Sequence, residues 1–207
     1  MKLMYSPTSP FVRRVRAVAL ELGLADRITL ETVQVAPGRE NEAFATTVNP
    51  LRKVPALVLD DGTVLIDSSV ICAYLDSLAG GGRIIPARAP ELWQVLSQQA
   101  IAIGMAEALV LARYEVALRP QPLRWPEWLE DQEGRFWSGL AWFERIAATA
   151  LEPRCGVIDV SQIALACCLG YADFRFSELG WLARAPRVST WYREFMQRPS
   201  MSTTAPA

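Results

Sequence analysis

A serine that precedes a proline is the first pattern that could carry chemistry. Ser9-Pro10 follows a short apolar segment and precedes apolar residues at helical spacing, as a helix cap and first-turn proline do. The free N–H groups of a helix start stabilise an anion such as a thiolate. The chain contains no histidine, so Ser9 has no imidazole base to make it a nucleophile. We expect Ser9, or the adjacent Thr8, to donate a hydrogen bond to a thiol from another molecule; simple helix capping is the alternative.

A second candidate lies at Lys53-Val54-Pro55, before an apolar segment. A cis Val54–Pro55 bond would leave the Val54 N–H and C=O groups free to pair with an extended peptide. Lys53 could then bind a carboxylate of that peptide. The alternative for Lys53 is an ordinary solvated lysine in front of a core strand.

A third candidate is Asp67-Ser68, at another expected helix start. Ser68 and the free N–H groups suit a carboxylate, and Asp67 suits an ammonium group. Together they suit the head group of an amino acid, although capping alone would also explain them.

The elements that must position these residues fall into two parts. Residues 1–79 predict the order β-α-β-α-β-β-α, with strands over 2–5, 27–35, 54–59 and 64–66 and a weak helix over 40–48. A linker follows, rich in glycine and proline. Residues 87–207 show no strand signal and predict helices over 90–118, 126–150, 159–174 and 187–197. The expected fold is α+β, with a small mixed domain (1–79) followed by an all-helical one (87–207).

The order and spacing of the three candidate groups resemble the glutathione S-transferase family, especially its bacterial, serine-containing members. The resemblance covers nearly the whole chain and rests on residues 8–13, 49–57, 60–62, 67–71, 158–176 and 186–199. It implies a thioredoxin-like first domain, a helical second domain, a homodimer, and glutathione as co-substrate without a metal. One departure is that Asp159 and Gln162 stand where the family has Ser/Thr and Asp, and this pair can still form a capping box.

The same resemblance assigns roles to single residues. Ser9 stands where related proteins carry a reactive cysteine, which implies thiol activation for conjugation rather than disulfide exchange. Val54 would pair with the cysteinyl backbone of glutathione, before a cis Pro55, and Lys53 would bind the glycyl carboxylate. The γ-glutamyl end would be held by Asp67 and Ser68. Phe11, in the Ser9 motif, is the remaining expected glutathione contact.

The expected activity is glutathione conjugation to a small hydrophobic electrophile, with a role in detoxification. A glutathione-binding carrier or regulatory protein with little turnover, and a glutathione-dependent peroxidase or dehalogenase, remain alternatives. The electrophile should bind between the two domains. Candidate lining residues, each of which could instead belong to the core, are Trp93, Met105, Leu109, Tyr114, Trp125 and Phe174.

The composition of the chain argues against several other classes of protein. Of the 207 residues 51% are hydrophobic, enough for a core, and the net charge of −1 offers no field for nucleic acid or an anionic membrane. Residues 100–106 and 163–171, the longest apolar runs, are shorter than the ~20 residues of a membrane span. The cysteines (Cys72, Cys155, Cys167 and Cys168) form no CxxC pair. They predict neither a metal site nor a disulfide scaffold, and a reduced, cytoplasmic setting is expected.

Overall fold

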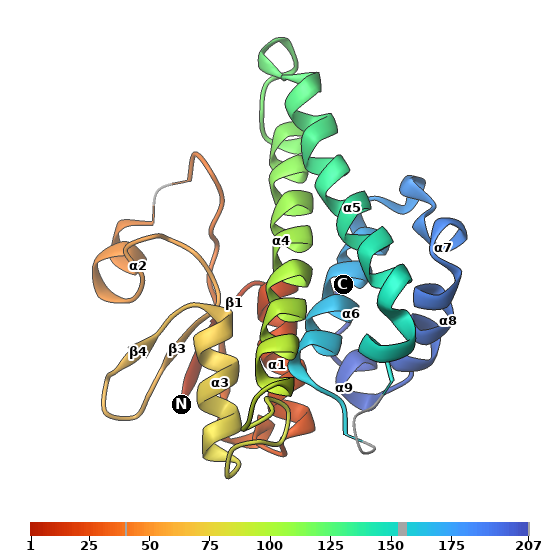
Figure 1. Ribbon diagram of the computed structural model, residues 1–207. Coiled ribbons are helices and arrows are strands. Elements are labelled where there is room, and N and C mark those ends of the chain that lie inside the picture. Colours follow the sequence, from red (N-terminus) through yellow and green to blue (C-terminus); the bar gives the residue numbers. More distant parts are fainter. Residues whose placement is uncertain (40, 153–156, 207) are drawn as a thin grey trace.

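The first part of the chain builds a small mixed sheet with helices around it. The computed structural model describes residues 1–39, 41–152 and 157–206. Its strands are β1 (Lys2–Tyr5), β2 (Thr29–Thr32), β3 (Ala56–Val58) and β4 (Val64–Leu65), in the spatial order β2-β1-β3-β4 (Figure 1). β1 is parallel to β2, which requires a crossover through a helix, whereas β3 is antiparallel to both β1 and β4.

Three helices complete this domain: α1 (Pro10–Glu21), α2 (Glu42–Thr47) and α3 (Ser68–Leu78). The predicted order β-α-β-α-β-β-α is therefore confirmed. The strand expected over 27–35 is shorter than predicted and ends at Thr32. The Val33 N–H still donates to the Tyr5 carbonyl at 2.9 Å, and Val33 and Val35 pack against the small cluster around Phe44 of α2. The helix expected over 40–48 begins after its cap Asn41, and residue 40 lies outside the described part of the chain.

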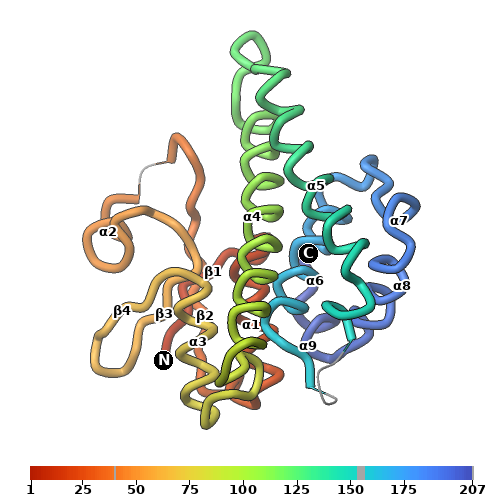
Figure 2. Tube along the Cα trace, in the orientation of Figure 1, coloured from red at the N-terminus to blue at the C-terminus, as the bar shows by residue number. Residues whose placement is uncertain are grey.

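The second part is helical, and Figure 2 shows its two longest helices running side by side beyond the rest of the molecule. Its helices are α4 (Glu91–Ala117), α5 (Pro126–Ala150), α6 (Val160–Arg175), α7 (Trp181–Arg184), α8 (Pro186–Phe195) and α9 (Pro199–Ser202). Within the described residues, no strand follows β4. The four predicted helices are present, and the short α7 and α9 were not anticipated.

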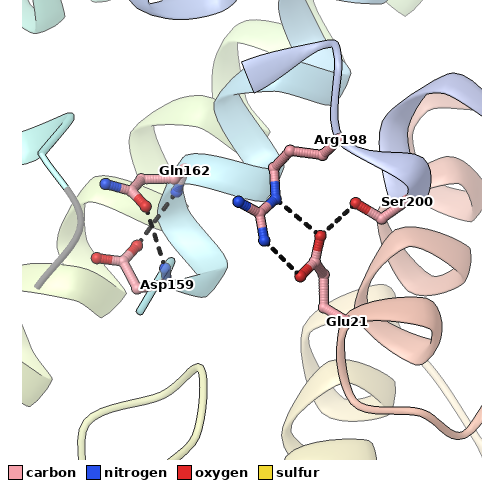
Figure 3. A network of polar contacts seen from close by, with 5 residues as sticks. All are labelled: Glu21, Asp159, Gln162, Arg198 and Ser200. Carbon is pink, nitrogen blue, oxygen red and sulfur yellow. Dashed lines mark hydrogen bonds and ion pairs between the residues drawn. The ribbon is translucent and has the colours of Figure 1, made fainter. Parts of the chain in front are cut away.

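The central helix of this bundle is α6, whose residues from Val160 to Ala172 are all buried. It begins with the expected capping box (Figure 3). Asp159 Oδ1 accepts hydrogen bonds from the Ser161 and Gln162 N–H groups at 2.9 and 3.2 Å, and Gln162 Oε1 accepts one from the Asp159 N–H at 3.2 Å. The Asp-x-x-Gln pair therefore forms the capping box predicted from the sequence, although it differs from the family's Ser/Thr-x-x-Asp pattern.

Two large apolar clusters hold the molecule together. One lies wholly among the helices around Phe136, Phe143 and Leu165. The other joins the two parts of the chain, because Leu3 and Val15 share it with Ile163. The position of α1 is thus fixed by the sheet and by α6 together.

Helix α4 is the one described helix whose length and hydropathy would suit a membrane span, with a mean hydropathy of 1.6 over 18 residues. Half of that window is buried inside the fold, as in the core helix of a bundle. It packs against α5 and α6, and in Figure 1 it runs alongside α5.

Candidate functional site

The first candidate group lies at the start of α1, where Ser9 is the N-cap. Its Oγ accepts a hydrogen bond from the Val12 N–H at 3.3 Å, which is long for such a bond. Ser9 and Thr8 are both half-buried, and the first turn that follows contains no acidic residue. The positive end of α1 therefore has no carboxylate beside it in its own first turn, and the Ser9 hydroxyl hydrogen remains available for a donor bond.

The second candidate group lies just before β3. The Val54–Pro55 peptide bond is cis, as the resemblance implied. Asn49, 2% exposed, supports this turn by donating to the Lys53 carbonyl at 2.8 Å. Within the described chain, no backbone hydrogen bond uses the Val54 N–H or C=O group. Lys53 is exposed and forms no ion pair with any carboxylate that the structure describes.

The third candidate group lies at the start of α3. Asp67, whose peptide bond to Ile66 is cis, is the exposed N-cap and accepts a hydrogen bond from the Ser69 N–H at 2.8 Å. Ser68 is buried, with 3% exposure. Its Oγ and that of Ser69 accept hydrogen bonds from Nη2 of Arg14 on α1, at 2.9 and 3.1 Å.

Arg14 is a residue that the sequence prediction missed. The available signal was an arginine pair, Arg13-Arg14, placed between Val12 and Val15 in a helix whose apolar residues turn inward. Both arginines are buried, at 4% and 1% exposure.

The fold brings the three groups to one side of the sheet domain. Met4 pairs with Ala56, so the C-terminal end of β1, which leads to Ser9, lies beside the start of β3. The Arg14 contact with Ser68 then ties α1 to the start of α3. Ser9 and Arg14 are five positions apart on α1, a rise of about 7.5 Å, which is within the length of one tripeptide.

The helical part of the chain packs against the end of α1 that carries Ser9. Phe11 is half-buried and packs on the cluster that contains Tyr171, while Val15, later in α1, shares the other cluster with Ile163, earlier in α6. The side chain of Arg13, early in α1, lies against Gly170 in the second half of α6. The start of α1 therefore lies beside the last turns of α6.

Polar groups gather near these last turns of α6. Burial raises the pKa of Tyr171 to about 12, while the charges of Arg175 and Arg113 act in the opposite direction. Burial also raises the pKa of Tyr114. Neither arginine forms an ion pair with a carboxylate of the described residues.

The expected lining residues of the electrophile site divide into three groups. Tyr114 and Phe174 are half-buried on the second half of α4 and the last turns of α6, where this site is expected. Met105 and Leu109 are buried in the helical core. Trp93 and Trp125 are 63% and 61% exposed.

The cysteines do not take part in this arrangement. Cys72, Cys167 and Cys168 are fully buried free thiols, and burial raises the pKa of each of them, for Cys167 to about 12. Such thiols are poor nucleophiles. Cys155 lies outside the described residues.

Comparison with known proteins decides the family. The sequence profile of the glutathione S-transferase N-terminal domain matches residues 3–83, and that of the C-terminal domain matches residues 126–194. The chain belongs to the glutathione S-transferase family. Among its relatives is the "Uncharacterized GST-like protein YibF" of Escherichia coli (strain K12), which is 30% identical over 206 residues, 100% of this chain and 98% of that protein.

Solved structures of glutathione S-transferases match the whole chain. A glutathione transferase family member from Pseudomonas fluorescens Pf-5, with bound glutathione, is 40% identical and has a TM-score of 0.94, covering 100% of this chain and 98% of that one. A structure of a family member from the same organism holds S-(propanoic acid)-glutathione, with 40% identity, a TM-score of 0.89 and full coverage of both chains. These matches confirm the expected family and the expected thioredoxin-like and helical domains.

Proposed function

We propose that this protein binds glutathione along its first domain and transfers it, as a thiolate, to a small electrophile. The observation that carries the proposal is that the Ser9 hydroxyl, the Val54 backbone and the start of α3 lie on one side of the sheet domain, with the Val54 N–H and C=O groups unpaired among the described residues. Glutathione supplies the groups that match them in order: a thiol, a peptide backbone and an amino-acid head group. Relatives with bound glutathione support the same ligand.

In this arrangement the sulfur lies against the start of α1, within reach of Ser9 or Thr8. Val54 pairs with the cysteinyl backbone, Lys53 binds the glycyl carboxylate, and Asp67 with Ser68 holds the γ-glutamyl end. Phe11 packs between the sulfur and the helical domain. The helix end and the hydroxyl stabilise the thiolate over the thiol, so the bound sulfur is nucleophilic at neutral pH without a metal.

The electrophile binds, in our proposal, between Phe11 and the half-buried Tyr114 and Phe174. The apolar surface there suits a hydrophobic body. The two arginines near Tyr171, Arg113 and Arg175, favour an electrophile that also carries a carboxylate. The S-(propanoic acid)-glutathione held by the P. fluorescens structure is a glutathione conjugate whose S-substituent carries such a carboxylate.

The central test compares Ser9→Ala and Thr8→Ala with the wild type. A charge-assisted hydrogen bond contributes about 1.5–3 kcal/mol, so removing the hydroxyl that contacts sulfur should raise the pKa of bound glutathione by about 1–2 units. Thiolate ultraviolet absorbance measures this pKa, and an aryl halide assay measures turnover. If neither alanine variant changes the thiol pKa, thiolate stabilisation by these hydroxyls is wrong.

The same assay separates the alternatives. Turnover of peroxides or haloalkanes in place of conjugation would favour a peroxidase or a dehalogenase. Tight glutathione binding without turnover of any electrophile class would favour a carrier. An unsaturated acid and its neutral amide, compared at equal concentration, test the proposed carboxylate preference.

We propose further that the protein is a homodimer that acts in detoxification in the cytoplasm. An open groove of about 660 Å³ between α4 and α5, lined by small residues such as Gly104 and Gly134 and by the half-exposed Leu111, offers a surface for a second copy. Light scattering of the purified protein tests the proposed dimer, and a monomeric mass would contradict it.

A further inference from the structure

Arg14 is a buried cation without an acidic partner among the described residues. Its side chain is 1% exposed, and its hydrogen bonds go to two hydroxyl oxygens, Ser68 Oγ and Ser69 Oγ. Its Nε and Nη1 atoms are buried and have no hydrogen-bond partner in the part of the chain that the structure describes. The buried thiols of Cys72 and Cys167 also lie near it, and burial raises the pKa of both, so they stay neutral and give no counter-charge.

This placement is unfavourable unless an anion binds nearby. A buried charge without a counter-ion destabilises a fold, and here the guanidinium lies beside the start of α3, which is itself positive. The one acidic group at this helix start, Asp67, is exposed and is already used to accept the Ser69 N–H. A ligand carboxylate at Ser68 and Ser69 would be stabilised by the guanidinium and by the free N–H groups of α3 together.

The direction of the hydrogen bonds adds a second argument. Arg14 is the donor in both contacts, so the Ser68 and Ser69 oxygens act as acceptors. Each hydroxyl keeps its own hydrogen, which must be donated to some other acceptor. Two fixed hydroxyls with hydrogens left to donate match the two oxygens of a carboxylate.

We propose that Arg14 is a positioning residue for the γ-glutamyl carboxylate of glutathione, orienting the Ser68 and Ser69 hydroxyls towards that carboxylate and supplying the positive charge behind them. This inference rests on the proposed function, since it assigns a new role within the same site. It predicts that Arg14 contributes to glutathione affinity rather than to the reaction of the bound thiolate.

Arg13 is the matched control for this proposal. It is the next residue on α1, carries the same charge and is similarly buried, at 4% exposure. Its Nη2 donates to the Met201 carbonyl at 3.0 Å, so it fixes the C-terminal segment instead of α3. A general effect of losing a buried arginine from α1 should therefore appear in both Arg13→Gln and Arg14→Gln.

The experiment measures the Kd for glutathione by calorimetry, together with KM, kcat and Tm, for both variants and the wild type. Arg14→Gln should weaken glutathione binding about 10- to 100-fold, as expected for loss of charge-assisted hydrogen bonding, with kcat at saturation changed less than about threefold. Arg13→Gln should lower Tm but leave the Kd for glutathione within about twofold. Arg14→Lys, which keeps the charge but lacks the planar fork, should restore part of the affinity.

A second ligand isolates the carboxylate. Glutathione amidated at the γ-glutamyl α-carboxylate should bind wild type and Arg14→Gln equally well, because the group that Arg14 serves is absent. An Arg14→Gln protein that folds and binds glutathione as the wild type does, or that loses the same factor for both ligands, would overturn the proposal.

Two further outcomes are informative. If Arg14→Gln does not fold, Arg14→Lys and the single variants Ser68→Ala and Ser69→Ala replace it. Each of these should weaken glutathione and spare the amidated ligand, and equal losses for both ligands would count against the proposal. A wild-type protein that binds no glutathione would refute the proposed function as well, whereas glutathione binding that is independent of Arg14 refutes the inference alone.

Discussion

The end of α1 is tied to the C-terminal segment by one carboxylate, which makes Glu21 a sensitive point for stability. Glu21 accepts hydrogen bonds from Arg198 Nε at 2.9 Å and Nη2 at 2.8 Å, and from the Ser200 hydroxyl (Figure 3). The substitution Glu21→Gln keeps the shape of the side chain and removes its charge. It should loosen the contact of α9 with α1.

The size of the effect follows from the exposure of the pair. Losing one partner of a fully buried pair costs about 3–5 kcal/mol, and an exposed pair is worth about 0–1 kcal/mol. The Glu21 side chain is 15% exposed, but that of Arg198 is 38% exposed, so solvent screens the pair in part. We expect a loss of about 1–2 kcal/mol in unfolding free energy, or about 2–8 °C in Tm for a domain of this size.

The pH dependence gives the sharper test. Burial raises the pKa of Glu21, but the hydrogen bonds from Arg198 and Ser200 outweigh it, and the pKa is lowered overall from the usual 4.5. A carboxyl whose pKa is lowered by folding stabilises the protein above its unfolded pKa. This stabilisation is lost as the pH falls through the folded pKa. The Tm difference between wild type and Glu21→Gln should therefore be full near neutral pH and shrink below about pH 4.

Calorimetry at several pH values measures this difference. Glu31→Gln is the control, because Glu31 pairs with Lys2 and both side chains are 50% exposed, so its Tm should change by no more than about 4 °C. A Tm difference for Glu21→Gln that is unchanged at low pH, or no larger than that of Glu31→Gln, would refute the reasoning.

Two other substitutions test the cap of α6 and the glycyl end of the proposed glutathione site. Asp159→Ala removes the acceptor of the Ser161 and Gln162 N–H groups, so urea denaturation should show a loss of about 1–2 kcal/mol; an unchanged midpoint would contradict the assigned cap. Lys53→Ala should raise the KM for glutathione up to about fivefold, as expected for an exposed ion pair, with kcat and Tm unchanged; a loss of kcat would place Lys53 elsewhere in the mechanism.

The helix starts could be predicted from sequence because their signals are local. Ser9, Asp67 and Asp159 each cap a helix through N–H groups two or three positions further along the chain. The capping residue and the groups that it satisfies therefore lie in the same short window of sequence. Two of the three candidate groups, at Ser9 and at Asp67-Ser68, were predictable for the same reason, whereas Lys53-Val54-Pro55 precedes a strand.

Contacts between segments that are far apart in the sequence leave no local sequence pattern of this kind. The bond from Arg14 to Ser68 joins residues 54 positions apart, and the bond from Arg198 to Glu21 spans 177 positions. Helix α8 is a third case: its first free N–H groups, at Arg187 and Val188, donate to a carboxylate of α5 instead of a neighbouring cap. A local pattern cannot show which buried arginine meets which hydroxyl, because packing of whole elements decides it.

The apolar cluster that Leu3 and Val15 share with Ile163 has a consequence for engineering. The linker divides the polypeptide, but the interior is continuous across it. A fragment ending near residue 79 would expose to water the wall of α1 that normally meets α6, and should aggregate or stay molten when expressed alone. Chimeras that exchange the helical half between relatives, to acquire a new electrophile, must therefore transfer the buried residues of this cluster along with the substrate-facing residues.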